Sequence, residues 1–175
     1  MRRLVVITGP PGSGKTTAAI RVAEELRSRG LEVGGFVTRE VREGGARIGF
    51  DVVELSGASS VPLARKGPSG PHRLGSYAVF PENLEELGIP AITAAVERGA
   101  VLIVDEVGPM ELMSRRFVEA VGSSVSSLER SLFTVHFRAK HPLIERLNSS
   151  ATLRLVVRFG EAERVAREAV NHLLG

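Results

Sequence analysis

The stretch that decides the fold is residues 4–17, Leu4-Val-Val-Ile-Thr-Gly-Pro-Pro-Gly-Ser-Gly-Lys-Thr-Thr17. It begins with a continuous apolar run, Leu4 to Thr8, which is typical of a β-strand buried on both faces. A loop rich in glycine and proline follows from Gly9 to Gly14. From Lys15 to Gly30, apolar residues recur at helical spacing and end at a glycine, which predicts a helix with a C-terminal stop. The predicted order is therefore strand, glycine loop, helix.

The rest of the chain alternates strand patterns with helix patterns. Two β-rich segments, 33–41 and 46–55, flank Gly44-Gly45 and predict an antiparallel hairpin with Phe36 and Phe50 on its buried face. Further strands are expected at 77–80, 100–104, 132–135 and 153–157, a flexible loop at 65–73, and further helices at 81–99, 116–121, 142–147 and 161–174. This alternation predicts a single α/β domain over residues 1–175. We expect three layers, with a mainly parallel sheet and the hairpin as an antiparallel addition.

Composition excludes several classes of protein. The chain has 175 residues, of which 43% are hydrophobic and 25% charged, as expected for one globular domain and not for a disordered segment. No apolar run is long enough to span a membrane, and the one after Arg3 is too short for a signal peptide. The absence of cysteine excludes disulfides, thiol catalysis and zinc sites with cysteine ligands. We expect a cytoplasmic protein without membrane association, and we favour a monomer.

The basic residues are unevenly divided between lysine and arginine. The formal net charge is +3, and Lys15, Lys66 and Lys140 are the only lysines among 23 basic residues. Arginine suits the planar recognition of phosphate groups, but no block of consecutive basic residues appears. A dedicated nucleic-acid surface is therefore not the leading interpretation.

Residues Gly9 to Thr16 have two glycines five apart followed by lysine and threonine, the pattern of a phosphate-binding loop (P-loop). Gly12 and Gly14 allow the backbone to adopt positive φ and to approach phosphate oxygens closely. Successive backbone N–H groups at the start of a helix then form an anion-binding concavity. Lys15 is expected to reach the β- and γ-phosphates, and the Thr16 hydroxyl to supply an oxygen ligand to Mg²⁺.

A second apolar run, Leu102-Ile103-Val104, ends in two acids, Asp105 and Glu106, which is the Walker B form. Asp105 is expected to hold the Mg²⁺ shell through water. Because adjacent strand residues point to opposite faces, both acids serve one site only if the chain bends, and we assign that bend to Gly108-Pro109. Glu106 would then orient or deprotonate the attacking water, which favours hydrolysis over phosphoryl transfer.

Other polar residues near the predicted strand ends are secondary candidates. Thr134 and His136 end the strand after Asp105, where a polar residue can sense a γ-phosphate, although such a position is more often ordinary. Candidates for an arginine finger are Arg115, Arg116 and Arg138. Arg39, Glu40 and Arg47 on the hairpin could line a base or partner surface, but a solvated strand face is favoured. Met110, Leu112 and Met113 are interpreted as core.

Four motifs together resemble the THEP-type nucleoside triphosphatases, which include the cancer-related nucleoside triphosphatase. These motifs are residues 8–17, Gly34-Gly-Phe-Val-Thr-Arg-Glu40, Arg47-Ile-Gly-Phe50 and Val104-Asp-Glu-Val-Gly-Pro-Met-Glu-Leu112. They stand in the order typical of that family and cover about the first two-thirds of the chain. The chain departs from the family pattern at Pro109, where lysine is common, and residues 157–161 lack the Asn-Arg pair expected near the last strand.

The resemblance implies a compact α/β fold and slow, Mg²⁺-dependent hydrolysis of nucleoside triphosphates (ATP, GTP, CTP, UTP) to diphosphates and phosphate. It also implies two nucleotide-binding stretches. The first is Gly9, Pro10, Pro11, Gly12, Ser13, Gly14, Lys15, Thr16 and Thr17. The second is Leu102, Ile103, Val104, Asp105, Glu106, Val107, Gly108 and Pro109.

Three functions remain open at this stage. The leading one is a nucleoside-triphosphatase in which Lys15 and Glu106 are catalytic, while Thr16 and Asp105 place Mg²⁺. A small-molecule or nucleotide kinase would need an arginine-rich lid, for which residues 65–73 are too short. An NTP-dependent nucleic-acid-binding module would explain the high isoelectric point, and salt-sensitive binding to nucleic acid would support it.

Overall fold

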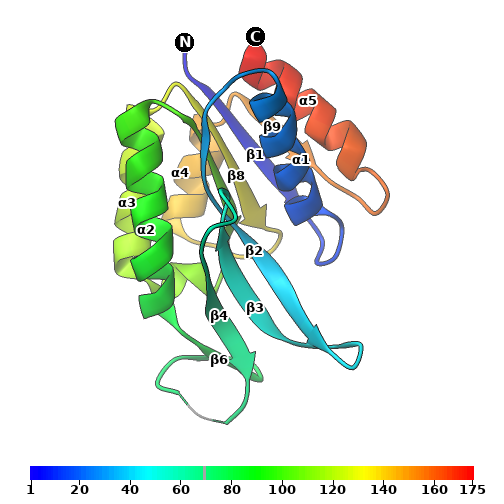
Figure 1. The fold of residues 1–175 in the computed structure, drawn as a ribbon, viewed down its shortest axis with the longest axis vertical. Coiled ribbons are helices and arrows are strands. Elements are labelled where there is room, and N and C mark those ends of the chain that lie inside the picture. Colours follow the sequence, from blue (N-terminus) through cyan, green and yellow to red (C-terminus); the bar gives the residue numbers. More distant parts are fainter. Residues whose placement is uncertain (69) are drawn as a thin grey trace.

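One mixed sheet runs through the molecule in the strand order β5-β6-β4-β3-β2-β7-β8-β1-β9 (Figure 1). The structure, a computed structural model, describes residues 1–68 and 70–175. The described strands are β1 (Arg3–Gly9), β2 (Val33–Glu43), β3 (Ala46–Glu54), β4 (Ser60–Lys66), β5 (Arg73–Leu74), β6 (Tyr77–Val79), β7 (Val101–Val107), β8 (Arg130–His136) and β9 (Leu153–Val156). The described helices are α1 (Lys15–Ser28), α2 (Pro81–Arg98), a 3₁₀ turn η1 (Glu111–Met113), α3 (Arg115–Ser127), α4 (Pro142–Ser150) and α5 (Ala162–Leu174).

Helices cover both faces of the sheet, which confirms the three-layer α/β prediction. In Figure 1, α1 and α5 lie on one face, and α2, α3 and α4 lie on the other. Successive β1 side chains point into opposite cores: Val5 and Ile7 pack with α1 and α5, whereas Leu4 and Val6 pack with the other helices. The apolar run that opens the sequence is therefore buried on both sides, as its composition predicts.

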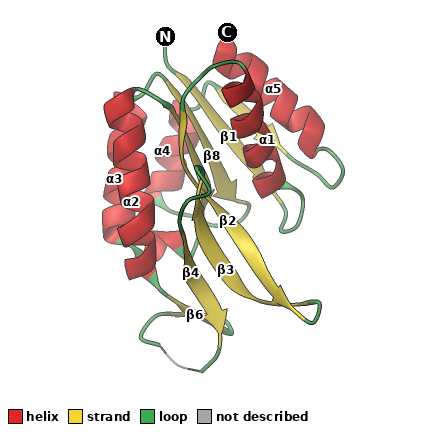
Figure 2. Cartoon of the chain, viewed as in Figure 1, coloured by secondary structure: helices red, strands yellow, loops and turns green. Residues whose placement is uncertain are grey.

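The predicted hairpin forms, but it is an integral part of the sheet. β2 pairs antiparallel with β3 and also parallel with β7, where Phe36 lies opposite Val104. Phe36 is fully buried, while Phe50 is only partly buried. Beyond β3, the strands β4, β6 and β5 continue the antiparallel part. Figure 2 shows the long strands β2 and β3 reaching past the helical layers, where they form a wall.

Two elements differ from the sequence-based expectation. β4 was not predicted; it contains Pro62, and proline is rare inside strands. The strand tolerates Pro62 because β6 pairs only with Ala64 to Lys66, so no β6 carbonyl needs an N–H at Pro62, whose own carbonyl accepts from Asn83 Nδ2 at 2.8 Å. α3 is longer than the predicted helix 116–121, because buried packing of Phe117, Val121 and Val125 outweighs the low helix propensity of its serines.

The loop predicted at 65–73 is shorter in the structure, because strand pairing includes residues at both of its ends. β4 continues to Lys66, and β5 begins at Arg73. Ser69 of that loop lies outside the described residues. No helix in residues 1–68 and 70–175 combines the length and the apolar character needed to cross a membrane.

Candidate functional site

The glycine loop between β1 and α1 has the backbone conformation that its sequence predicts. Gly12 and Gly14 adopt φ values of 74° and 109°, which residues with a Cβ atom rarely adopt. The Ser13 N–H donates to the carbonyl of Pro10 at 3.1 Å, which closes the loop into a tight turn. Inside it, Lys15 is only 8% exposed and its Nζ donates to the Gly9 carbonyl at 2.8 Å. The ammonium group is therefore held at the start of α1.

Asp105 is fully buried at the end of β7, and its carboxylate joins three other elements. Its Oδ2 accepts hydrogen bonds from Thr16 Oγ1 at 2.8 Å and from the Thr38 N–H at 3.1 Å. Its Oδ1 accepts from Thr134 Oγ1 at 2.6 Å. The structure thus brings together Thr16 and Asp105, the two residues expected to place Mg²⁺. Thr134, considered as a γ-phosphate sensor, is buried and orients this carboxylate.

Thr38 is a site residue that sequence reasoning missed. Besides its N–H contact, its Oγ1 donates to the backbone carbonyl of Asp105 at 2.8 Å. The residue lies in the Gly-Gly-Phe-Val-Thr-Arg-Glu motif, which carried the family resemblance but no assigned role. β2 runs past Phe36, which faces Val104, so Thr38 comes level with the acidic end of β7.

The predicted bend at Gly108-Pro109 is wrong, because the irregularity lies within β7 itself. The pairing with β8 slips by one residue between Val104 and Val107, so Asp105 and Glu106 together face one residue of the partner strand. The peptide bond between the two acids is cis. A β-bulge redirects side chains locally: Glu106 lines the cavity described below, whereas Asp105 is fully buried and does not line it. The Glu106 Oε2 lies 3.8 Å from Lys15 Nζ.

Burial controls the acidity of the site carboxyls. It raises the pKa of Asp105 to about 6, and the nearby Glu106 charge adds to this, although hydrogen bonds from Thr134, Thr16 and Thr38 lower it. Burial also raises the pKa of Glu106, against the lowering effect of the Lys15 ammonium. Sequence reasoning gave no role to Glu111, a buried residue of η1 whose pKa burial raises well above its usual range. Of these three carboxyls, Glu106 is the one paired with Lys15.

A cavity of about 830 Å³ opens beside the glycine loop. Its walls come from the loop and α1, the β2–β3 hairpin, the β5–β6 turn and the segment after β7. The lining residues are Pro11, Gly12, Ser13, Gly14, Lys15, Thr16, Thr17, Thr38, Arg39, Glu40, Arg47, Phe50, Leu74, Gly75, Ser76, Tyr77, Glu106, Pro109, Met110, Glu111 and His136. This volume falls within the range of small-molecule sites.

Several sequence-predicted residues lie outside this cavity. Leu102, Ile103, Val104 and Val107 are fully buried in the two cores, so their side chains support the strand and do not face a ligand. Gly9, Pro10 and Gly108 do not line the cavity, although the Gly9 carbonyl holds Lys15. The proposed fingers Arg115, Arg116 and Arg138 are exposed and also absent from its walls.

The hairpin arginines are more than a solvated face, because Arg39 and Arg47 line the cavity. Arg47 donates to the Tyr77 hydroxyl at 2.9 Å and to Glu40 at 3.2 Å, and lies 5.1 Å from the centroid of the Phe50 ring. These contacts hold Arg47 in place in the part of the cavity wall that lies opposite the glycine loop. Arg39 lines the cavity, unlike the three arginines considered from the sequence.

His136 lies on the cavity wall beside the phosphate loop, as its position after β8 suggested. Its Nδ1 accepts hydrogen bonds from the N–H groups of Arg138 and Ala139, both at 3.1 Å. Burial lowers the pKa of His136, and the charges of Lys15 and Arg138 lower it further. The ring is therefore neutral at pH 7, with Nδ1 as the acceptor.

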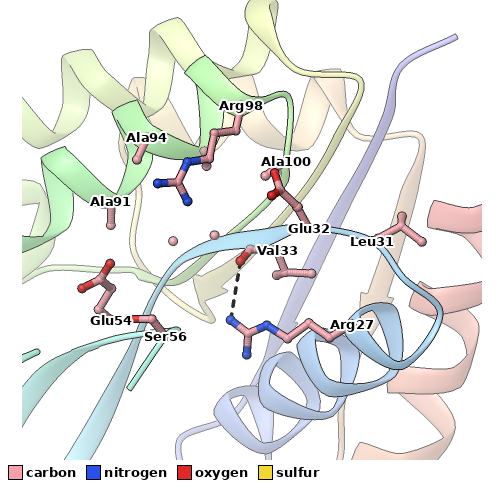
Figure 3. A pocket seen from close by; sticks show the side chains of 13 residues that line it. Arg27, Leu31, Glu32, Val33, Glu54, Ser56, Ala91, Ala94, Arg98 and Ala100 are labelled. Atoms are coloured by element: carbon pink, nitrogen blue, oxygen red, sulfur yellow. Dashed lines mark hydrogen bonds between the residues drawn. The ribbon is translucent and has the colours of Figure 1, made fainter. Parts of the chain in front are cut away.

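A smaller cavity of about 270 Å³ lies near the starts of β2 and β7 (Figure 3). Arg27, Glu32, Glu54 and Arg98 supply its charged side chains. The guanidinium of Arg27 is held by the carbonyl of Leu55 at 3.0 Å. Open α/β sheets bind ligands at the carboxyl ends of parallel strands, so the larger cavity at that end is the candidate site.

The donor set beside the larger cavity fits Mg²⁺ held jointly with phosphates. Thr16 and Asp105 offer hard oxygen donors in contact with each other, and Mg²⁺ prefers such ligands. Among residues 1–68 and 70–175, no group of three or more His, Cys, Asp or Glu residues forms a metal cage. One or two protein oxygens completed by water and substrate phosphates is the usual arrangement for this ion.

Asp105→Asn is expected to stabilise the free protein at pH 7.5. The pKa of Asp105 rises from 3.8 to about 6 on folding. The folded state thus binds more protons between these values, so the free energy of unfolding falls as pH rises through this window. Above pH 6, the ionised Asp105 lowers the free energy of unfolding by about 3 kcal/mol in full. Asparagine keeps its oxygen toward Thr16 and Thr38 and donates its N–H to Thr134 after that hydroxyl turns.

Urea unfolding followed by circular dichroism, at pH 7.5 and near pH 4, measures this effect. The gain should amount to at least about 1 kcal/mol at pH 7.5 and should shrink toward pH 4. Asp51→Asn is the matched control, because Asp51 forms an ion pair with Arg65 at 2.7 Å and gains nothing by neutralisation. Equal or lower stability of Asp105→Asn at pH 7.5 would contradict the argument.

The fold and the site together define a P-loop nucleotide-binding protein: a phosphate loop after the first strand, beside a Walker B acid two strands away in the sheet. The sequence profile of a family described as NTPase matches residues 4–170. The chain therefore belongs to this NTPase family.

Similar proteins agree with this assignment. The nucleoside-triphosphatase THEP1 of Methanopyrus kandleri is 42% identical over 172 residues, covering 97% of this chain and 94% of that protein. The crystal structure of THEP1 from Aquifex aeolicus superimposes with a TM-score of 0.84 at 29% identity, covering 97% of this chain and 98% of the other. The solution structure of a human cancer-related nucleoside triphosphatase gives a TM-score of 0.80 at 36% identity, covering 97% and 96%.

Proposed function

We propose that this chain hydrolyses nucleoside 5′-triphosphates to the diphosphate and phosphate, with Mg²⁺ as its cofactor. One observation carries the proposal: a second carboxylate, Glu106, lines the cavity 3.8 Å from the lysine of the phosphate loop. A kinase must keep water away from the transferred phosphate, whereas a hydrolase needs a base beside it. The printed names of the relatives, nucleoside-triphosphatase, support the same reading.

Each residue of the loop has a task that its geometry permits. The backbone N–H groups at the start of α1 would bind the phosphates. Lys15 is buried and pre-positioned by the Gly9 carbonyl, so it can stabilise the charge that develops on the terminal phosphate. Thr16 and Asp105 would hold Mg²⁺, which supplies neutralising charge to the β- and γ-phosphate oxygens when bound.

Glu106 is the residue that we assign to water. Its side chain is 24% exposed and lines the cavity, so the carboxylate is open to the space where the triphosphate would bind. Its raised pKa makes it a stronger base than an exposed glutamate, because burial disfavours the charged form. As a base it would orient a water molecule and accept its proton.

Phosphate release from ATP, GTP, CTP and UTP tests this function. With Mg²⁺, all four nucleotides should be turned over within about tenfold of one another, because the loop binds the phosphates that they share. Chelation of Mg²⁺ should abolish turnover. The assay is run with and without nucleic acid and a panel of small acceptors. A many-fold increase that depends on one acceptor would contradict hydrolysis and indicate phosphoryl transfer.

A further inference from the structure

The cavity beside the glycine loop extends well past Lys15 and Glu106. Along the sheet, the loop follows β1 and Glu106 ends β7, while β2, β3, β6 and β5 lie further on in the same direction. Figure 2 shows β2 and β3 reaching beyond the helical layers. The part of the cavity wall that these strands supply has no task in the proposed hydrolysis. We call it the hairpin half of the cavity, and its residues are Glu40, Arg47, Phe50, Leu74 and Tyr77.

A nucleotide held by the loop does not extend into the hairpin half. Its terminal phosphate would lie beside Lys15 and Glu106, whose Nζ and Oε2 atoms are 3.8 Å apart. The remaining phosphates would lie back over the loop, where the N–H groups at the start of α1 bind them. Because a polyphosphate is a linear chain, the nucleoside then lies on the loop side of Glu106. The hairpin half lies on the other side, past the phosphate that reacts.

The hairpin half has the lining of a site for planar aromatic ligands. The rings of Phe50 and Tyr77 are tilted by 56° with their centroids 5.6 Å apart, and both residues are only partly buried. The Arg47 guanidinium lies 5.1 Å from the Phe50 centroid and 5.9 Å from the Tyr77 centroid. Because 42% of its side chain is exposed, Arg47 offers a planar face on which a further ring can stack. Small-molecule sites combine such aromatic surface with a few fixed polar groups.

The charges around the hairpin half favour a negatively charged ligand. The carboxylate of Glu40 accepts hydrogen bonds from two arginines, Arg42 at 2.9 Å and Arg47 at 3.2 Å. Lys66 adds a third positive charge, since its Nζ lies 6.0 Å from the Tyr77 centroid. Three cations thus surround one acid, which gives this end of the cavity a positive potential. The negative group of a ligand would therefore point outward, toward the hairpin.

We propose that the hairpin half binds a planar aromatic anion together with the nucleotide, and that this second ligand controls hydrolysis; the inference rests on the proposed function. The aromatic ring stacks on the Arg47 guanidinium, and the negative group lies among Arg42, Arg47 and Lys66. In phosphoryl transfer the attacking and leaving oxygens stand in line, so water attacks from the side away from the loop. A ligand in the hairpin half limits the entry of that water and slows hydrolysis without displacing the nucleotide.

Binding of naphthoate, a planar aromatic anion, tests the proposed ligand class. Tyr77 is the only tyrosine of a chain without tryptophan, so its emission reports on this wall. Naphthoate should quench that emission, to a plateau, in protein already saturated with MgADP. In calorimetry, naphthamide, which lacks the charge, and cyclohexanecarboxylate, which lacks the aromatic ring, should each bind at least about fivefold more weakly. Equal affinity for the three compounds, or no binding of naphthoate, would overturn the proposal.

Substitution of Arg47 locates the bound ligand. Arg47→Met should weaken naphthoate binding by about 5- to 30-fold, because it removes both the stacking surface and the charge. Arg47→Lys keeps the charge but not the planar face, so it should recover only part of that affinity. Arg115→Met is the matched control, because Arg115 is exposed on α3 and absent from the cavity wall. Parent-like naphthoate affinity in a folded Arg47→Met protein would place the ligand elsewhere and refute the second site.

Steady-state kinetics test whether the second ligand acts beside the nucleotide. Saturating naphthoate should lower kcat for ATP hydrolysis and leave KM unchanged, because it excludes water and does not compete for the phosphate loop. A rise in KM with kcat unchanged would count against the proposal, since naphthoate would then occupy the nucleotide site. Competition by MgADP, but not by magnesium tripolyphosphate, would do the same, because the base itself would then fill the hairpin half.

The second site and the proposed function fail separately. Naphthoate binding is measured without turnover, so its absence in a protein that hydrolyses ATP refutes only the second site. A protein that binds naphthoate beside MgADP but releases no phosphate from any nucleoside triphosphate refutes the proposed function, and with it the control of hydrolysis, while the binding site stands.

Discussion

Lys15→Met is expected to lower the rate of nucleoside-triphosphate hydrolysis by about 10²- to 10³-fold or more and to weaken triphosphate binding. The ammonium is buried, donates to the Gly9 carbonyl and is the basic group nearest to Glu106 in the cavity wall. Its charge is therefore already desolvated and aimed at the loop before substrate arrives. Methionine keeps the length and apolar stem of the side chain, so the loss reports on charge and not on packing.

Two further variants separate charge from shape at this position. Lys15→Arg retains the charge, but a planar guanidinium needs more room than the 8% exposed lysine has. We expect it to recover less than a tenth of the parent activity. Lys140→Met is the matched control, because Lys140 is exposed and absent from the cavity wall. Parent-like turnover and triphosphate affinity in a folded Lys15→Met protein would refute the assignment of the loop as a phosphate site.

The phosphate loop could be predicted from sequence because its requirements are local. Positive φ at Gly12 and Gly14, a buried strand before them and a helix after them are all set by neighbours in the chain. The same is true of the acidic end of β7, since an apolar run followed by two acids is a continuous pattern. These features involve few long-range choices, and the structure has each of them.

The environment of Asp105 could not be predicted in the same way, because it depends on how distant strands align. Thr38 reaches Asp105 only through the register of β2 against β7, and Thr134 only through that of β8. A pattern along one segment does not specify the register of a parallel pair. The bulge that brings Glu106 to the site is likewise a property of the pairing, and sequence reasoning placed that bend three residues too late.

The cavity wall shows a third limit of sequence reasoning. Arg47, Phe50 and Tyr77 come from strands that sequence patterns described only as hairpin and short strand. These three residues meet only because β4 lies between β3 and β6. Sequence reasoning did not predict this strand, which contains Pro62. Without that strand, Tyr77 had no predicted place, and a solvated strand face was favoured for Arg47 over a base or partner surface.

Glu106→Gln is the other variant for which we expect a very large effect, a fall in kcat of about 10²- to 10⁴-fold. Glutamine has the same shape and can still orient water, but it cannot accept a proton. Nucleotide affinity should stay the same or rise, because a negative charge near the terminal phosphate is removed. A loss in kcat without a loss in binding distinguishes this role from that of Lys15, where both quantities decline.

The pH dependence of the parent enzyme gives an independent check on Glu106. Burial raises its pKa, so activity should fall as pH decreases through that raised value, at higher pH than for an exposed glutamate. Glu119→Gln is the matched control, because Glu119 is exposed on α3 and pairs only with Arg115. If Glu106→Gln hydrolyses ATP at the parent rate, the proton acceptor lies elsewhere. The buried Glu111 would then be the next carboxyl to replace, since it is the remaining acid on the cavity wall near the loop.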